Sequence, residues 1–158
     1  LSEYELPEKV VKKMEENNKK GLYVELYDPN KHYGVDEFCQ KIEKSNAGFA
    51  NAIRNNLKKE EPTPFLCANV NGKMVGWTGA MWNEESGRGH FDGIAILDTV
   101  RGKGLGKALF SLLALYNKKG GAKFMTFYTG LNNHARYIYM GAGFKIIQSY
   151  ALMKKPLK

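Results

Sequence analysis

The most constraining feature of the sequence is a short stretch that combines three glycines with three cations and leads directly into an apolar segment. Residues 100–110 read VRGKGLGKALF. A strand-like run over residues 90–97 precedes this stretch, and residues 105–119 carry apolar side chains at helical spacing. A glycine-rich turn between a strand and a helix brings backbone N–H groups to the helix N-terminus, where they bind anions. The stretch therefore predicts a phosphate-binding loop.

Two common phosphate-binding patterns do not fit this loop. A nucleoside-triphosphate P-loop needs GxxxxGK followed by Ser or Thr, whereas Gly102 and Gly106 are one residue too close and alanine follows the lysine. A dinucleotide fingerprint needs GxGxxG and an acidic residue about 20 residues later, but the chain has no acid after Asp98. The remaining pattern is Arg-x-x-Gly-x-Gly, formed by Arg101, Gly104 and Gly106.

Charge is distributed unevenly along the chain. The formal net charge is +8, and all 16 acidic residues lie at or before Asp98. Residues 99–158 carry 11 Lys or Arg and no acid. A basic segment of this length favours an anionic ligand, for which a phosphorylated cofactor, a nucleic acid and an anionic membrane surface are the candidates.

The cysteines and the N-terminus indicate the setting in which the protein works. Cys39 and Cys67 have neither CxxC nor Cys/His spacing, so we expect no metal site and two buried, reduced thiols. Residues 1–20 are polar and lack the apolar core of a secretory signal, and no apolar run approaches the roughly 20 residues needed to span a bilayer. We therefore expect a cytoplasmic protein. Because the chain begins with leucine, we also expect that it is a fragment of a longer chain or has been trimmed.

Periodicity and turn residues predict one compact α+β domain. The Asn71-Gly72 pair is a strong hairpin signal. The predicted helices are 7–19, 36–57 with a break near Gly48, 105–119 and 132–140. The predicted strands are 21–28, 62–70, 73–82, 90–97, 122–129 and 144–153. This order predicts a three-layer α/β/α arrangement with a mixed, mostly antiparallel central sheet, an N-terminal helix or linker over residues 1–20 and a main domain over 21–158.

A second motif lies beyond the predicted helix 105–119, where residues 132–144 read NNHARYIYMGAGF. Together with the glycine loop, this motif resembles the GNAT superfamily of acyl-CoA-dependent N-acetyltransferases, whose later signature reads loosely N-x-x-A-x-x-L-Y-x-x-x-G-F. The residues in register are Asn132, Ala135, Tyr139, Gly143 and Phe144, with Ile138 in place of leucine. The resemblance extends over about residues 21–155. The chain also resembles the C-terminal half of tandem GNAT proteins, which implies an upstream domain that is missing from it.

The resemblance implies a fold and a co-substrate. In the family, the glycine loop cradles the pyrophosphate of coenzyme A, and the strand before the loop splays away from its neighbour so that its backbone pairs with the pantetheine arm. Asp98 stands where many members have proline. We therefore expect a GNAT-like fold with a splayed strand pair and acetyl-CoA as the co-substrate. The expected cofactor-binding residues are Ile94, Ala95, Ile96, Arg101, Gly102, Lys103, Gly104, Leu105, Gly106, Lys107, Asn132, Ala135 and Tyr139.

The resemblance also implies roles in catalysis. Tyr139 is the residue expected to protonate the leaving thiolate, and a backbone N–H near Ile94 is expected to bind the oxyanion. The base is open between His90, Asp92 and a chain of waters. Strand alternation predicts that His90, Asp92, Ile94 and Ile96 share one face.

The function expected from these features is acetyl transfer from acetyl-CoA to a primary amine of a small molecule or peptide, directly in a ternary complex. The absence of a clear glutamate base leaves a non-catalytic acyl-CoA-binding regulatory domain as an alternative. A nucleic-acid-binding module would need exposed aromatic residues interleaved with the cations, whereas these cations cluster around the glycine loop. We therefore expect neither a nucleic acid nor a membrane as partner.

Overall fold

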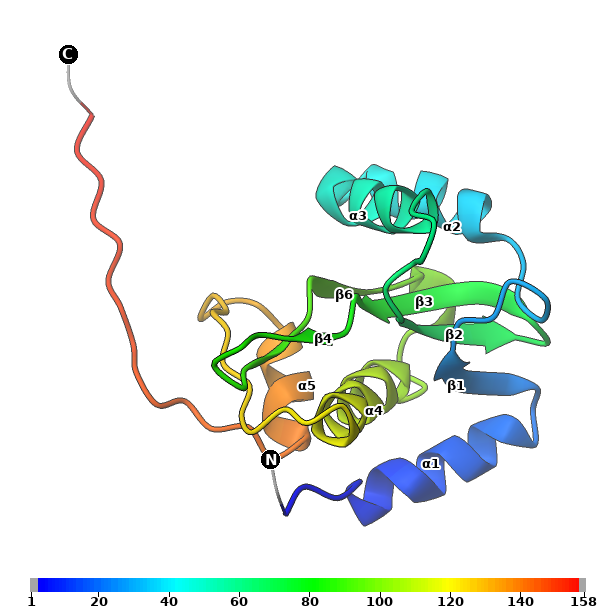
Figure 1. The fold of residues 1–158 in the computed structure, drawn as a ribbon, viewed down its shortest axis with the longest axis horizontal. Coiled ribbons are helices and arrows are strands. Elements are labelled where there is room, and N and C mark those ends of the chain that lie inside the picture. Colours follow the sequence, from blue (N-terminus) through cyan, green and yellow to red (C-terminus); the bar gives the residue numbers. More distant parts are fainter. Residues whose placement is uncertain (1–2, 157–158) are drawn as a thin grey trace.

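The structure, a computed structural model, describes residues 3–156 and has three layers. Helices α1 (Glu8–Asn18) and α4 (Leu105–Lys119) cover one face of a central antiparallel sheet, and helices α2 (Val35–Glu43) and α3 (Ala47–Leu57) cover the other (Figure 1). The predicted α+β, three-layer architecture is therefore confirmed.

The central sheet has the strand order β1-β2-β3-β6. Its strands are β1 (Leu22–Leu26), β2 (Leu66–Val70), β3 (Lys73–Gly79) and β6 (Gly93–Ile96). The smaller elements are the hairpin of β4 (Trp82–Asn83) and β5 (Gly89–His90), the short 3-10 helix η1 (Asp98–Val100) and helix α5 (Ala135–Gly141). Asn71 and Gly72 have φ values of 49° and 92°, and a two-residue turn between twisted strands requires such positive values, so the predicted hairpin between β2 and β3 is confirmed.

The sheet is buried on both faces, so packing on both sides holds its edge strand β6 in place. On one face, Leu109, Phe110 and Leu113 of α4 are fully buried, as the predicted apolar stripe requires. On the other face, Phe38 and Trp77 belong to a second buried cluster beneath α2 and α3. Within residues 3–156, no helix is both long and apolar enough to cross a membrane.

The break in the predicted helical region 36–57 lies earlier than Gly48. Helix α2 ends at Glu43 and α3 starts at Ala47, with Asn46 between them. The Asn46 side-chain oxygen accepts a hydrogen bond from the Phe49 N–H at 3.1 Å and so caps α3. A capping asparagine, rather than a glycine, therefore separates the two helices.

The predicted strand 90–97 is interrupted, which changes the faces of its residues. Residues 91–92 separate β5 from β6. Phe91, Ile94 and Ile96 pack on the α4 side of the sheet, whereas Asp92 lines a pocket on the α3 side. The prediction that His90, Asp92, Ile94 and Ile96 share one face is therefore wrong, because the break shifts the alternation of side chains by one residue.

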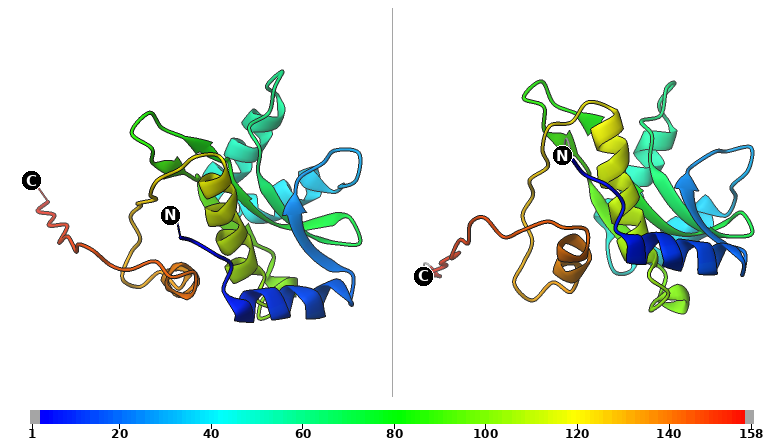
Figure 2. Two further views of the ribbon diagram at one scale, coloured as in Figure 1. Left: turned by 60° about the horizontal axis from the view of Figure 1, so that its bottom comes forward. Right: turned by 90° about the horizontal axis from the view of Figure 1, so that it is seen from below.

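Two predicted strands do not form. Residues 122–129 contribute one isolated bridge, between Phe124 and Arg88, and residues 144–153 leave the body of the protein without a strand partner among the residues described (Figures 1 and 2). The alternating aromatic and β-branched residues of these segments are typical of strands. Strand propensity depends on packing and on a paired backbone, however. Residues 122–129 pair with the chain only around Phe124, next to β5, and residues 144–153 have no neighbouring strand within residues 3–156.

Candidate active site

A groove of about 910 Å³ runs along β6 and the start of α4. Most of the residues predicted to bind the cofactor line this groove. They are Ile94, Ala95, Ile96, Arg101, Gly102, Gly104, Leu105, Gly106, Lys107 and Ala135. Three other predicted residues, Lys103, Asn132 and Tyr139, do not belong to its lining.

The glycine loop presents its backbone to the groove. Gly102 and Gly104 have φ values of 78° and 76°, which a residue with a side chain rarely adopts. A Cβ atom at Gly104 would also lie 3.0 Å from the Lys13 side chain. The first hydrogen bond of α4 joins the Ala108 N–H to the Gly104 carbonyl, so the N–H groups of residues 105–107 precede the helical ladder. These free donors and the helix dipole favour an anion in the groove.

Helix α1 braces the loop, a contact that the sequence did not reveal. The Asn17 side-chain amide donates a hydrogen bond of 2.8 Å to the Lys103 carbonyl, which turns that residue's backbone toward α1. Lys9 and Lys13, four residues apart on α1, line the groove. In the sequence, the i,i+4 spacing of the two lysines indicates that they share one face of a helix. It does not indicate which part of the protein that face contacts.

The charge of the groove suits a pyrophosphate. Its lining contains four cations, Lys9, Lys13, Arg101 and Lys107, and no carboxylate. Arg101 also pairs with Asp98 through Nε at 2.9 Å, although both side chains remain largely exposed. Cations and free backbone N–H groups are the partners that phosphate oxygens need, so the residues present fit the pyrophosphate of coenzyme A.

The outer edge of β6 offers unpaired backbone groups to the groove. The Leu97 N–H donates to the Val75 carbonyl at 2.9 Å, and β6 pairs with β3 alone among the described strands. Because hydrogen-bonded and non-hydrogen-bonded residues alternate in an antiparallel pair, Ile94 and Ile96 turn their backbone groups outward. An extended amide-containing ligand can therefore add to this edge.

The second sequence motif is arranged differently from the prediction. Helix α5 begins at Ala135, and the Asn133 side chain, not that of Asn132, accepts a hydrogen bond from the Ala135 N–H at 3.0 Å. Asn132 is exposed and lies outside the helix. Capping depends on the exact helix start, which the motif locates only to within a turn.

Tyr139 packs into an aromatic cluster beside the groove. Its ring centroid lies 4.7 Å from that of Phe110 and 4.6 Å from that of Phe127. The neighbouring Ile138 lines the groove itself. Burial raises the pKa of Tyr139, so its hydroxyl remains a proton donor at neutral pH.

A second pocket, of about 420 Å³, adjoins the groove at the start of β6. The two cavities share Asn46 and Phe49 in their linings. The Phe49 ring lies over Gly93, where any side chain would overlap it. The pocket is lined by Asn46, Gly48, Phe49, Ala52, Asn55, Asn56, Lys59, Ala80 and Asp92.

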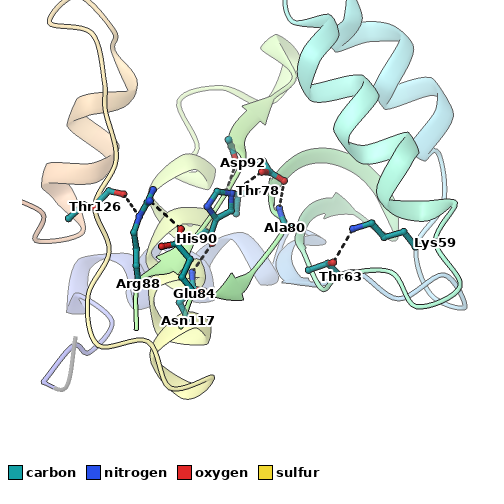
Figure 3. Close-up of polar contacts among 11 residues, drawn as sticks. Lys59, Thr63, Thr78, Ala80, Glu84, Arg88, His90, Asp92, Asn117 and Thr126 are labelled. Atoms are coloured by element: carbon teal, nitrogen blue, oxygen red, sulfur yellow. Dashed lines mark hydrogen bonds and ion pairs between the residues drawn. The ribbon is translucent and has the colours of Figure 1, made fainter. Parts of the chain in front are cut away.

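Asp92 and His90 form a hydrogen-bonded pair at this pocket (Figure 3). His90 Nε2 lies 3.1 Å from one carboxylate oxygen of Asp92, and the Ala80 N–H donates to the other oxygen at 3.2 Å. The Trp82 ring lies against the imidazole, with centroids 4.5 Å apart. Asp92 lines the pocket and His90 does not, so the structure brings the two candidate bases together but exposes the carboxylate to a ligand.

Comparison with known proteins identifies relatives of this arrangement. The model of a family described as the acetyltransferase (GNAT) family matches residues 23–144. None of the curated proteins compared with the chain matches it.

Within residues 3–156, no group of three His, Cys, Asp or Glu side chains is arranged to hold a metal ion.

Solved structures of acetyltransferases share the fold. A complex of AAC(6')-Iy with a bisubstrate analogue is 14% identical, with a TM-score of 0.63 over 86% of this chain and 99% of that one. A putative acetyltransferase from Agrobacterium tumefaciens is 16% identical, with a TM-score of 0.61 over 84% and 99%. A ribosomal-protein-alanine N-acetyltransferase from Brucella melitensis is 18% identical, with a TM-score of 0.59 over 85% and 99%.

Proposed function

The chain belongs to the GNAT family of acetyltransferases, and we propose that it moves the acetyl group of acetyl-CoA to a primary amine of a small molecule or peptide by direct transfer. The observation that carries this proposal is the junction of the two cavities at Asn46 and Phe49. A donor in the groove and an amine in the pocket meet there, which supplies the proximity that a ternary-complex reaction needs.

The donor side positions and polarises the thioester. The glycine loop and the start of α4 hold the pyrophosphate, and the open edge of β6 pairs with the pantetheine arm. The outward backbone N–H of Ile94 then lies at the end of the groove nearest the pocket. An N–H fixed in this position stabilises the negative charge that develops on the carbonyl oxygen.

On the acceptor side, Asp92 is the base and His90 positions it. As the amine nitrogen bonds to the carbonyl carbon, it releases a proton to the Asp92 carboxylate. The Asp92 side chain is 41% exposed, which lets the proton pass on to solvent. His90 and the Ala80 N–H each hold one carboxylate oxygen and thereby fix its direction.

The leaving group needs a proton donor, and Tyr139 has the chemistry for this role. When the bond between carbon and sulfur breaks, the thiolate of coenzyme A receives a proton or hydrogen bond from the tyrosine hydroxyl. A tyrosinate formed in this way regains a proton from solvent, to which Asp92 has passed the proton of the amine. Burial keeps this hydroxyl protonated. Tyr139 follows the groove-lining residue Ile138 in α5, with its ring in the aromatic cluster beside the groove.

A thiol-release assay across a panel of primary amines tests the proposed function. We expect acetyl-CoA to raise the melting temperature and at least one amine to release free coenzyme A faster than the background hydrolysis. Stabilisation by acetyl-CoA without amine-dependent release across the panel would instead favour a non-catalytic acyl-CoA-binding domain. Absence of both effects would contradict the assignment of the groove as the donor site.

A further inference from the structure

The acceptor pocket carries one positive and one negative side chain in an otherwise uncharged lining. Asp92 is the single carboxylate among its lining residues, and Lys59 is the single cation. Figure 3 shows them reaching the site from different elements, Lys59 just beyond the end of α3 and Asp92 just before β6. The other polar side chains in the lining are amides, which carry no charge.

Lys59 is free to bind an anion from a ligand. Its ammonium group donates a hydrogen bond to the Thr63 hydroxyl at 3.4 Å, and it has no carboxylate partner within residues 3–156. By contrast, Lys31, Lys41 and Lys73 are each paired with a glutamate. An unpaired ammonium at the wall of a pocket favours a carboxylate or phosphate.

An acidic side chain in the loop between β4 and β5 is already neutralised. Glu84, in the loop before β5, pairs with Arg88 at 3.2 Å. The donor groove next to the pocket has four cations and no carboxylate in its lining. Within the linings of the two cavities, a polycationic acceptor would therefore meet one carboxylate, Asp92, and several like charges, which disfavours its binding.

We propose that the acceptor is a small zwitterion: a primary amine that faces Asp92 and an anionic group, either a carboxylate or a phosphate ester, that binds Lys59. This inference rests on the proposed acetyl transfer and adds the class of acceptor. Asn46 and Asn55 supply neutral hydrogen-bond groups for the part of the molecule between its two charges. The pocket volume of about 420 Å³ suits a molecule of amino-acid size.

Four amines with the same assay test the proposal. L-serine carries a carboxylate, phosphoethanolamine carries a phosphate, ethanolamine has neither group, and spermidine is a polycation. We expect kcat/KM for serine or phosphoethanolamine to exceed that for ethanolamine by at least tenfold, and spermidine to be the poorest. Which of the two zwitterions is better identifies the anionic group.

The variant Lys59→Met isolates the anion contact. We expect it to raise the KM for the better zwitterion about tenfold while it leaves the KM for ethanolamine unchanged. Lys58→Met removes a neighbouring exposed lysine that lies outside the pocket lining and should change neither value.

The outcomes separate this inference from the proposed function. If ethanolamine or spermidine is acetylated as well as the zwitterions, or if Lys59→Met leaves the zwitterion KM unchanged, acetyl transfer stands and the zwitterion is ruled out. If no amine in a broad panel releases coenzyme A although acetyl-CoA stabilises the protein, the proposed function fails and this inference fails with it.

Discussion

In the proposed function, the donor groove and the acceptor pocket recognise their ligands by different means. The groove combines four cationic side chains with many backbone groups, which the glycines of residues 102–106, the start of α4 and the open edge of β6 provide. The pocket relies on side chains that come from α3, from the turn after β3 and from the break before β6. Backbone recognition is nearly independent of sequence outside the glycines, whereas side-chain recognition changes with every substitution. The two cavities therefore differ in how freely their specificity can change while the fold is kept.

This difference predicts that substitutions in the two regions affect different kinetic constants. Changes in the pocket should lower kcat or raise the KM for the amine, and changes in the loop should weaken binding of acetyl-CoA. Four substitutions test this separation, beginning with the one for which we expect the largest effect.

Asp92→Asn should lower kcat by about 10²- to 10⁴-fold, the range typical of a lost acid–base group. The amide keeps the size of the side chain but cannot accept the proton of the amine. Steady-state kinetics with a saturating amine measure the loss, and calorimetry should give an unchanged Kd for acetyl-CoA. Glu85→Gln, in the exposed loop before β5, is the matched control and should keep the wild-type kcat. If Asp92→Asn keeps the wild-type kcat, a group other than Asp92 acts as the base.

Tyr139→Phe should lower kcat by about 10²-fold, near the lower end of that range. The phenyl ring still fills the cluster with Phe110 and Phe127, so the free energy of unfolding and the Kd for acetyl-CoA should stay the same. The exposed Tyr137 provides the control, Tyr137→Phe. Full kcat in Tyr139→Phe would show that another group, or water, protonates the thiolate.

Gly104→Val should raise the Kd for acetyl-CoA about 5- to 30-fold. A left-handed φ costs a residue with a side chain about 1–2 kcal/mol, and the new side chain would also crowd Lys13. Isothermal titration measures the change, while kcat at saturating acetyl-CoA should stay within a few-fold. Gly121→Val carries a similar backbone strain in open space outside the groove, so it should cost stability without weakening acetyl-CoA binding. If Gly104→Val and Gly121→Val have the same Kd for acetyl-CoA, the glycine loop does not bind acetyl-CoA through its backbone.

Glu25→Gln should have the smallest effect, on the pH dependence of stability rather than on either cavity. Partial burial alone would raise the pKa of Glu25, but hydrogen bonds from Lys31, His32 and Asn69 outweigh it and lower the pKa to about 2. A lowered pKa in the folded state contributes stability above about pH 4.5 that is lost as the pH falls toward 2. Urea unfolding between pH 7 and pH 3 should therefore show a flatter profile for the variant. Any change in the KM for amine or acetyl-CoA would contradict the separation of this end of the sheet from the site.

The glycine loop and the helix after it were predictable from sequence because their signals are local. The spacing of Gly104 and Gly106 after Arg101 places a turn at the start of a helix without knowledge of the rest of the fold. The acceptor pocket was not predictable in the same way, because Lys59, Ala80 and Asp92 are far apart in sequence and meet through tertiary packing. The break before β6 also moved Asp92 to the face opposite Ile94, a change that regular alternation cannot anticipate.

Pairing partners explain the remaining errors. The alternation over residues 144–153 indicates a strand, but a strand needs a neighbour with free backbone groups. His32 stands alone in the sequence but is buried, with its Nδ1 accepting the Asp28 N–H at 2.9 Å and its Nε2 3.0 Å from Glu25. A lone histidine in sequence does not show whether such partners exist.

The hydrogen bond from Asn17 to the Lys103 carbonyl has a practical consequence for anyone who shortens the chain. The residues matched by the family model begin at 23, so a chain cut at that boundary would lack α1. The shortened chain would keep every glycine of the loop but lose the support behind it and two of the lysines in the groove. We therefore expect changes in α1, a helix that contains none of the family's motif residues, to alter the affinity for acetyl-CoA without altering the choice of amine.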